Sequence, residues 1–266
     1  MKKSYAVAGI MILAAVLLVL PVGAKAEMYV EAYLGASLPD NMNDRTAIVA
    51  HNFGQVAAGN FPGHPQPAVI GGVKIGTWFV KEGFLGYNYP DWMKYLGFYL
   101  DFSYHRLDLK NQNFNTGIFA GGALVGFNNT DFRSEGTAAT LAFMFAARYG
   151  FFKDSEVPFG RLQPYIGVGP AIMWTTQEPK VTFRSTGHNV DFDSEGSTNI
   201  ALAVDAGVRY MALKNVSLDL SFRYRYTNPS YSYTGVISGP GQSTASFRYE
   251  PTLNLFSVQL GAAYHF

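Results

Sequence analysis

The chain has 266 residues, with 20 Lys and Arg against 19 Asp and Glu, and no cysteine. The near-neutral balance excludes a basic surface for nucleic acid, and the lack of cysteine excludes disulfides, thiolate metal sites and a lipid-modified N-terminal cysteine. With 21 Phe, 17 Tyr and 28 Gly, the chain is also too apolar for a disordered protein.

Residues 1–26 have the features of a secretory signal peptide. Lys2 and Lys3 precede an uncharged apolar run over residues 6–20, and Ala24-Lys25-Ala26 fits an A-x-A cleavage site. The run of about 15 residues is shorter than the roughly 20 that a membrane-spanning helix needs. We therefore expect cleavage after Ala26 and one exported domain over residues 27–266. Removal of Lys2, Lys3 and Lys25 leaves 17 basic residues against 19 acidic ones, a formal charge of 17 − 19 = −2.

Eight segments of this domain alternate between apolar and polar or small residues, which predicts strands with two different surroundings. The fifth segment contains Pro170, which cannot donate to a strand ladder and weakens that prediction. The segments are Met28 to Leu38, about Val69 to Phe79, Leu96 to His105, Leu141 to Phe151, Leu162 to Thr175, Leu202 to Tyr210, Val216 to Tyr226 and Phe256 to Phe266.

Alternation alone also fits a secreted soluble barrel with its apolar face inward. The connectors, however, alternate in length, at roughly 28, 14, 28, 9, 22, 4 and 24 residues, as in membrane barrels with long external loops and short periplasmic turns. We therefore predict an all-β fold, an eight-stranded antiparallel up-and-down transmembrane β-barrel. Its outward aromatic residues collect at two levels, as interfacial girdles do, and are Phe79, Tyr104, Phe151, Trp174, Tyr210, Tyr224 and Tyr226.

The inward faces of the predicted strands carry four acidic and five basic residues. An eight-stranded barrel leaves an interior just wide enough for side chains to fill, and buried charges persist when they are paired and hydrogen-bonded. We therefore expect an occluding lumen charge network of Glu31, Lys74, Asp101, Arg148, Asp205, Arg209, Asp219, Arg223 and Arg225. An open channel remains the alternative, because inward glycines such as Gly72 and Gly167 have no side chain to fill the lumen.

The signal peptide, the eight strands, the connector pattern and the aromatic end together resemble the small outer-membrane β-barrel family that includes the OmpA transmembrane domain, OmpX-like and Opa-like proteins. In that family the assembly machinery reads the closing strand, here ending in Tyr264 and Phe266. The resemblance implies a Gram-negative-type outer membrane, with membrane lipid, lipopolysaccharide, periplasmic chaperones and the barrel-assembly machinery as partners. Without the peptidoglycan-binding domain that OmpA carries after its barrel, a cell-wall anchor is not expected.

The resemblance implies a role as an adhesin, an envelope stabiliser or a small channel. Enzymes also occur on such barrels, but they need a nucleophile or an activated water beside a base. No histidine has metal-ligand spacing, and His105 lies roughly 13 Å from Asp101 along its strand. We therefore expect no catalytic, metal-binding or cofactor-binding residues. The alternatives to a structural and surface-interaction role are an OmpW-like, porin-like path for small or apolar solutes and, third, a lipid A-modifying enzyme.

The external loops are expected to carry the function, because binding residues concentrate on loops held by a rigid scaffold. The second loop contains an apolar stretch, Gly117 to Phe127, which predicts an interaction site, a cover for the barrel mouth or a contact with the lipid interface. Alternation around Gly239-Pro240-Gly241 predicts a hairpin above the membrane. We expect a monomer that binds a host or other surface ligand through these loops.

Overall fold

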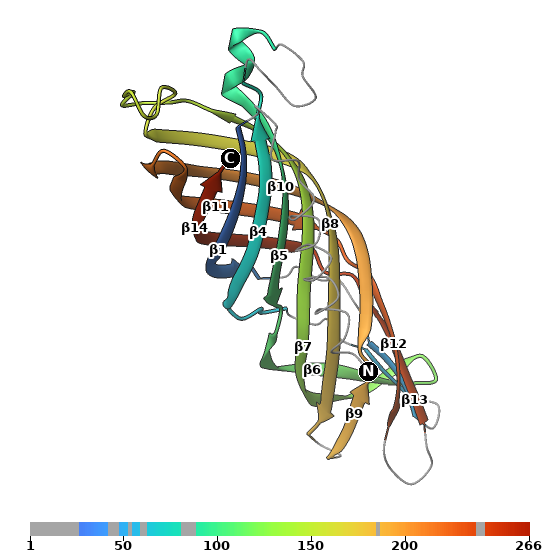
Figure 1. Ribbon diagram of the computed structural model, residues 1–266. Helices are drawn as coiled ribbons and strands as arrows, with labels where there is room; N and C mark the ends of the chain where they lie inside the picture. Colours follow the sequence, from blue (N-terminus) through green and yellow to red (C-terminus); the bar gives the residue numbers. More distant parts are fainter. Residues whose placement is uncertain are drawn as a thin grey trace.

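The computed structural model describes residues 27–41, 48–52, 55–58, 63–80, 89–184, 187–237 and 243–266. The predicted signal peptide lies outside these residues. Eight long strands form a closed antiparallel barrel (Figure 1). They are β1 (Glu27–Pro39), β4 (Ala68–Trp78), β5 (Leu96–Arg106), β7 (Ala123–Arg148), β8 (Leu162–Phe183), β10 (Glu195–Leu213), β11 (Val216–Thr227) and β14 (Leu253–His265).

The order of these eight strands around the barrel is β1, β4, β5, β7, β8, β10, β11 and β14. Pairing of β1 with β14, in which Leu34 faces Leu260, closes it. Such closure satisfies the backbone donors and acceptors of the strands without leaving a free edge. The up-and-down barrel predicted from the period-two alternation is therefore confirmed.

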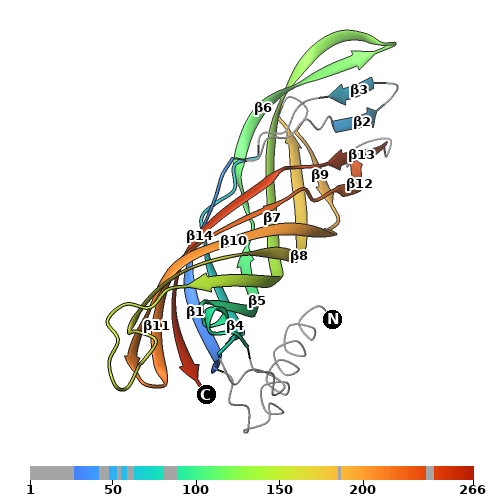
Figure 2. The same ribbon diagram turned by 90° about the horizontal axis from the view of Figure 1, so that it is seen from above.

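The six remaining strands form a second ring at the end of the barrel opposite the C-terminus (Figure 2). Each pairs with the next, in the order β7, β8, β9, β12, β13, β2, β3, β6 and back to β7, so the ring shares β7 and β8 with the barrel. We call it the outer ring. Its own strands are β2 (Ile48–Asn52), β3 (Gln55–Ala58), β6 (Leu109–Ala120), β9 (His188–Phe192), β12 (Tyr231–Ile237) and β13 (Ser243–Tyr249).

The outer ring corrects the prediction of a loop over Gly117 to Phe127. That stretch is the end of β6 and the start of β7, joined by a tight turn in which Gly121 and Gly122 have φ of 58° and 83°. Both values lie in the left-handed region that favours glycine. The pairing register shifts between Ile118 and Phe119, and this bulge interrupts the alternation by which a strand is recognised.

The hairpin expected around Gly239-Pro240-Gly241 is present in the pairing of β12 with β13, in which Tyr231 faces Tyr249. The three turn residues themselves lie outside the described part of the chain. Besides pairing with each other, β12 pairs with β9 and β13 with β2, so the hairpin forms part of the outer ring.

The barrel wall has apolar side chains outside and polar side chains inside. Leu34, Ile200 and Leu260 are exposed on its outer surface, whereas Lys74 and Arg223 are buried inside it. A short 3-10 helix, η2 (Asp91–Tyr95), precedes β5. Among the described residues, no helix combines the length and hydropathy needed to cross a membrane.

Candidate functional site: the barrel lumen

Lys74 lies at the centre of the lumen and is 1% exposed. It projects from β4, where its backbone neighbours are Glu31 on β1 and Asp101 on β5. Its Nζ atom lies 2.9 Å from Glu31 Oε1, 3.6 Å from Asp219 Oδ1 and 3.7 Å from Asp205 Oδ2. One ammonium group thus joins carboxylates from β1, β10 and β11.

Two arginines extend this network across the lumen. Arg223 Nη1 lies 2.7 Å from Asp101 Oδ1, and its Nη2 lies 2.8 Å from Asp205 Oδ2. Arg209 Nη2 lies 2.5 Å from Glu31 Oε2, and its Nε lies 3.4 Å from Asp219 Oδ2. Because Asp101 is on β5 and Arg223 is on β11, four strands away in either direction, the first pair spans the barrel.

Three tyrosine hydroxyls donate hydrogen bonds to the same carboxylates. Tyr33 donates to Asp101 Oδ1 at 2.8 Å. Tyr99 donates to Asp205 Oδ2 at 2.9 Å, and Tyr165 donates to Asp219 Oδ1 at 2.8 Å. The three rings also surround Lys74 Nζ, with their centroids 5.3 to 5.9 Å away. The tyrosines therefore supply both hydrogen bonds and cation–π contacts to the network.

At the end of the barrel where β1 begins, Arg148 forms a separate ion pair with Glu27 through two hydrogen bonds, one of them 2.6 Å long. Its guanidinium group lies between Trp78 and Phe159, with its central carbon 4.1 and 4.0 Å from the two ring centroids. Gln163 Oε1 accepts a further hydrogen bond from Nη1 at 2.9 Å. This arrangement closes the lumen where β1 begins and β7 ends.

Arg225 differs from the other lumen cations. It is 1% exposed, and its Nη1 donates to Thr140 Oγ1 at 3.1 Å and to Ser103 Oγ at 3.3 Å. Within the described part of the chain, no carboxylate lies within ion-pair distance of its guanidinium group. The structure therefore brings eight of the nine predicted network residues into ion pairs and leaves Arg225 beside them on neutral hydroxyl groups.

Several inward glycines do not leave open space in this part of the lumen, because aromatic side chains cover them. A Cβ atom at Gly72 would lie 2.3 Å from the Tyr33 hydroxyl oxygen. One at Gly76 would meet the Tyr29 ring at 2.7 Å, and one at Gly207 would meet the Tyr165 ring at 2.8 Å. The observation that favoured an open channel in the sequence is thus accounted for by the tyrosines.

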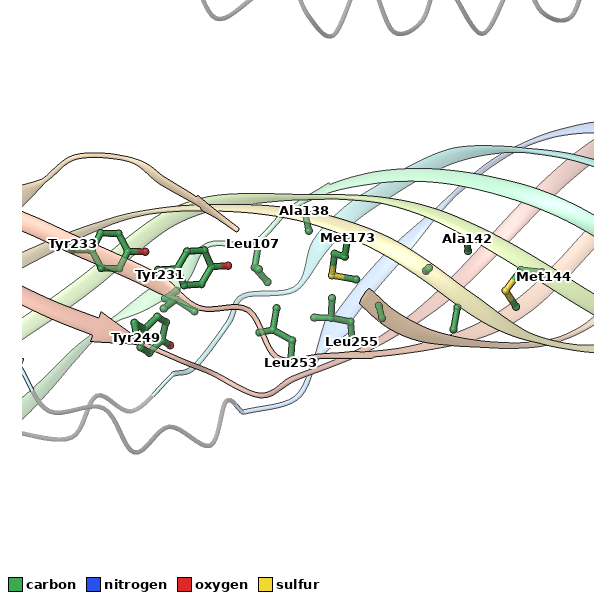
Figure 3. Close-up of a cluster of buried hydrophobic side chains, with 14 of the residues drawn as sticks. Leu107, Ala138, Ala142, Met144, Met173, Tyr231, Tyr233, Tyr249, Leu253 and Leu255 are labelled. Carbon is green, nitrogen blue, oxygen red and sulfur yellow. The ribbon is translucent and has the colours of Figure 1, made fainter. Parts of the chain in front are cut away.

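Above the ion pairs, toward the outer ring, an apolar cluster fills part of the lumen beside buried polar side chains such as Thr175 and Gln177. In Figure 3, Leu107, Met173, Leu253 and Leu255 point toward one another, and each is at most 1% exposed. Met173 is on β8, Leu253 and Leu255 are on β14, and Leu107 lies between β5 and β6. Further out, the buried ring of Tyr231 stacks on those of Tyr233 and Tyr249, with centroids 6.0 and 6.2 Å apart. The lumen therefore has an ionic section and, outside it, an apolar section.

The aromatic residues predicted as girdles lie on the outer surface of the barrel or beside it. Five are exposed, and Phe79 and Tyr224 are half-buried. Tyr264 and Phe266 are exposed at the end of the last strand, and their rings pack edge to face with centroids 5.1 Å apart. The exposed five are Tyr104, Phe151, Trp174, Tyr210 and Tyr226.

A closed antiparallel barrel with an apolar outer wall and a polar interior defines an integral β-barrel protein of the bacterial outer membrane. The chain belongs to the outer membrane protein beta-barrel domain family, whose model matches residues 12–266. No curated protein sequence matches it.

Three solved structures illustrate the likeness in fold. Neisserial surface protein A is 14% identical, with 90% of this chain and 97% of that chain covered and a TM-score of 0.40. OprG from Pseudomonas aeruginosa is 16% identical, with 91% and 96% covered and a TM-score of 0.44. A major outer membrane protein from Thermus thermophilus is 15% identical, with 91% and 100% covered and a TM-score of 0.45.

Proposed function

We propose that the protein is a non-enzymatic outer-membrane barrel whose lumen is occluded and whose outer ring carries its interactions at the cell surface. The observation that carries this proposal is the ion pair of Arg223 with Asp101, which crosses the barrel from β11 to β5, while Arg223 also binds Asp205 on the neighbouring strand β10. Around it, tyrosine rings cover Gly72, Gly76 and Gly207. Solute passage would require both the ion pairs and the rings to move.

The energetic cost of opening this network is high. Removing one partner of a buried ion pair typically costs about 3–5 kcal/mol, because the other charge stays buried and uncompensated. Arg223 and Lys74 each contact more than one carboxylate, so displacement of either exposes several charges at once. This favours a closed lumen over the alternative of a path for small or apolar solutes.

The pairing of the lumen acids also supports a non-enzymatic role. Each of Glu31, Asp101, Asp205 and Asp219 lies within 4 Å of a Lys or Arg nitrogen. A general base must be free to accept a proton in reach of a substrate, whereas these carboxylates are bound by cations inside the barrel. Within the described residues, no group of three or more His, Asp or Glu is arranged to hold a metal ion.

The outer ring is the surface that we assign to binding. It places an apolar hairpin end at the tip of β6 and β7, where Leu124, Val125 and Phe127 are exposed. Exposed apolar side chains grouped in this way are typical of interaction sites. We propose that a monomer binds a host or other surface ligand there.

The test of occlusion is single-channel conductance of the refolded protein in a planar bilayer. The wild type is expected to be silent, and an Arg223→Ala, Arg225→Ala double variant is expected to conduct. Arg248→Ala, which removes an exposed ion pair with Glu250 in the outer ring, serves as the matched control and should stay silent. A steady conductance of the wild type would contradict the proposal and place the channel function first.

A further inference from the structure

Arg225 occupies the boundary between the ionic and the apolar sections of the lumen. It projects from β11, and its two hydroxyl partners, Ser103 and Thr140, are direct neighbours on β5 and β7. Since β5 lies four strands from β11 in either direction, the side chain reaches across the barrel. It therefore spans the lumen on the side of the ion pairs that faces the outer ring.

The other buried cations already use the carboxylates available in the lumen. Arg148 binds Glu27, and Lys74, Arg209 and Arg223 share the remaining four acids. Arg225 Nε and Nη2 meet no acceptor in the described part of the chain. A guanidinium group keeps its proton in proteins, and a buried charge without a partner is strongly disfavoured.

The two hydroxyl groups add donors to those of the guanidinium. Each accepts a hydrogen bond from Arg225 Nη1, and each keeps its own O–H hydrogen for another acceptor. Arg223, two residues away on the same face of β11, adds a second positive charge nearby, although it is held by its own acids. The local chemistry is therefore that of a receptor for one negative charge.

Short side chains line several neighbouring inward positions, and the buried imidazole of His105 lies two residues beyond Ser103 on β5. Ala203 is the backbone neighbour of Arg225 on β10, and Ala142, Ala171 and Ala201 form a row across β7, β8 and β10. Leu255, which belongs to the apolar section, is the backbone neighbour of Arg225 on β14. An occupant thus meets donors on one side and hydrocarbon on the other.

We propose that Arg225, Ser103 and Thr140 form a binding site for a single monovalent anionic group inside the lumen. The group belongs either to a small inorganic ion or to the carboxylate end of an apolar acid, whose tail would lie in the apolar section. One charge suffices, because one guanidinium is left without a carboxylate. The site is independent of whether the barrel conducts.

The experiment is thermal unfolding of the refolded full-length protein in a non-ionic detergent, followed by circular dichroism. Sodium gluconate is replaced by sodium chloride or sodium nitrate at constant ionic strength, and sodium octanoate is added in a separate series. Binding to the folded state is expected to raise the Tm of the wild type by about 2 °C or more at saturation. A response to chloride or nitrate identifies a small ion, and a response to octanoate alone identifies an apolar acid.

Arg225→Met keeps the length of the side chain without its charge and is expected to lose the response. Arg106→Met, at an exposed arginine on the outer surface, is expected to keep it. Should Arg225→Met fail to fold, the Ser103→Ala, Thr140→Val double variant must show a weaker response than the wild type. An equal Tm of the wild type in all four salts, or an unchanged response in the variants of the site, overturns the proposal.

Discussion

The phenol ring of Tyr33 lies over Gly72, its cross-strand neighbour on β4. The Tyr33 hydroxyl donates to Asp101 at 2.8 Å and accepts from Arg223 Nη1 at 3.1 Å. The absence of a side chain at Gly72 therefore determines where a hydroxyl of the ion network can lie. Glycine at this position leaves the space that the Tyr33 ring occupies.

Gly72→Ala is expected to lower the free energy of unfolding by about 1–3 kcal/mol, because the added methyl group would overlap the Tyr33 ring and the backbone oxygen of Phe102 at 2.4 Å. Equilibrium unfolding in urea, with the protein in lipid vesicles, measures this change. Gly126→Ala is the control, since nothing lies within 4 Å of a Cβ atom there. Equal stability of the two variants would show that Tyr33 moves aside without cost.

Arg223→Ala is expected to lower the free energy of unfolding by about 3–5 kcal/mol, because it leaves Asp101 and Asp205 buried with less compensation. Adding Asp101→Asn should recover part of the loss, and a double-mutant cycle gives the coupling energy. For comparison, Arg248→Ala removes an exposed pair with Glu250 and should cost less than about 1 kcal/mol. An unchanged unfolding midpoint for Arg223→Ala would refute a stabilising role for the network.

Arg148→Lys tests the closure of the lumen at the end where β1 begins. Lysine keeps the charge but loses the paired hydrogen bonds to Glu27 and the flat contact with Trp78 and Phe159. We expect the free energy of unfolding to fall by about 1.5–3 kcal/mol. The same change at the exposed Arg106 should cost less than about 1 kcal/mol, and a similar small loss at Arg148 would mean that charge alone matters there.

The turn between β7 and β8 provides a test of pH dependence outside the membrane. The Val157 backbone N–H, which donates to Asp154 Oδ1 at 2.7 Å, and the Arg161 guanidinium together hold the pKa of Asp154 below its ordinary value of 3.8. A lowered pKa favours the ionised form in the fold. Its stabilisation is therefore present above pH 3.8 and is lost as the pH falls through the lower, folded-state pKa.

NMR titration of the Asp154 carboxyl group is expected to give a pKa below 3.8 in the wild type. Arg161→Met should raise that pKa but leave it below 3.8, because the backbone donors at Glu156 and Val157 remain. Arg248→Met, far along the chain in β13, should not change it. Identical titrations of the wild type and Arg161→Met would exclude the guanidinium as a cause.

The eight spanning strands could be predicted because two different surroundings impose a period of two on their side chains. The extension of β7 back to Ala123 and of β8 to Phe183 could not be predicted. These strand ends reach beyond the barrel into the outer ring, where both faces need no longer differ in polarity. There the outward positions become polar and mixed, as at Arg133 and Lys180. The outer ring as a whole depends on pairings between distant segments, such as β13 with β2, for which local sequence holds no signal.

The alternation of inward and outward positions along each strand locates most of the lumen charges. It does not show which of these charges pair with one another. Glu27 was missed because it is the first residue of the expected mature chain and lies just before the first predicted strand. Tyr33, Tyr99 and Tyr165 also have inward parity in the sequence, but parity alone does not show that their rings fill the lumen. Setting each inward tyrosine against an inward glycine on the next strand, as in Tyr33 and Gly72, is the signal that could have found them.

The barrel and the outer ring both close between the first quarter of the chain and its last, through β1 with β14 and through β2 with β13. Both levels consequently remain open sheets until β13 and β14 have paired with β2 and β1. Every earlier stage presents unpaired strand edges, which recruit other chains. Loss of β13 and β14 would thus leave unpaired strand edges in the barrel and in the outer ring at once. Such a fragment would aggregate rather than form a smaller barrel.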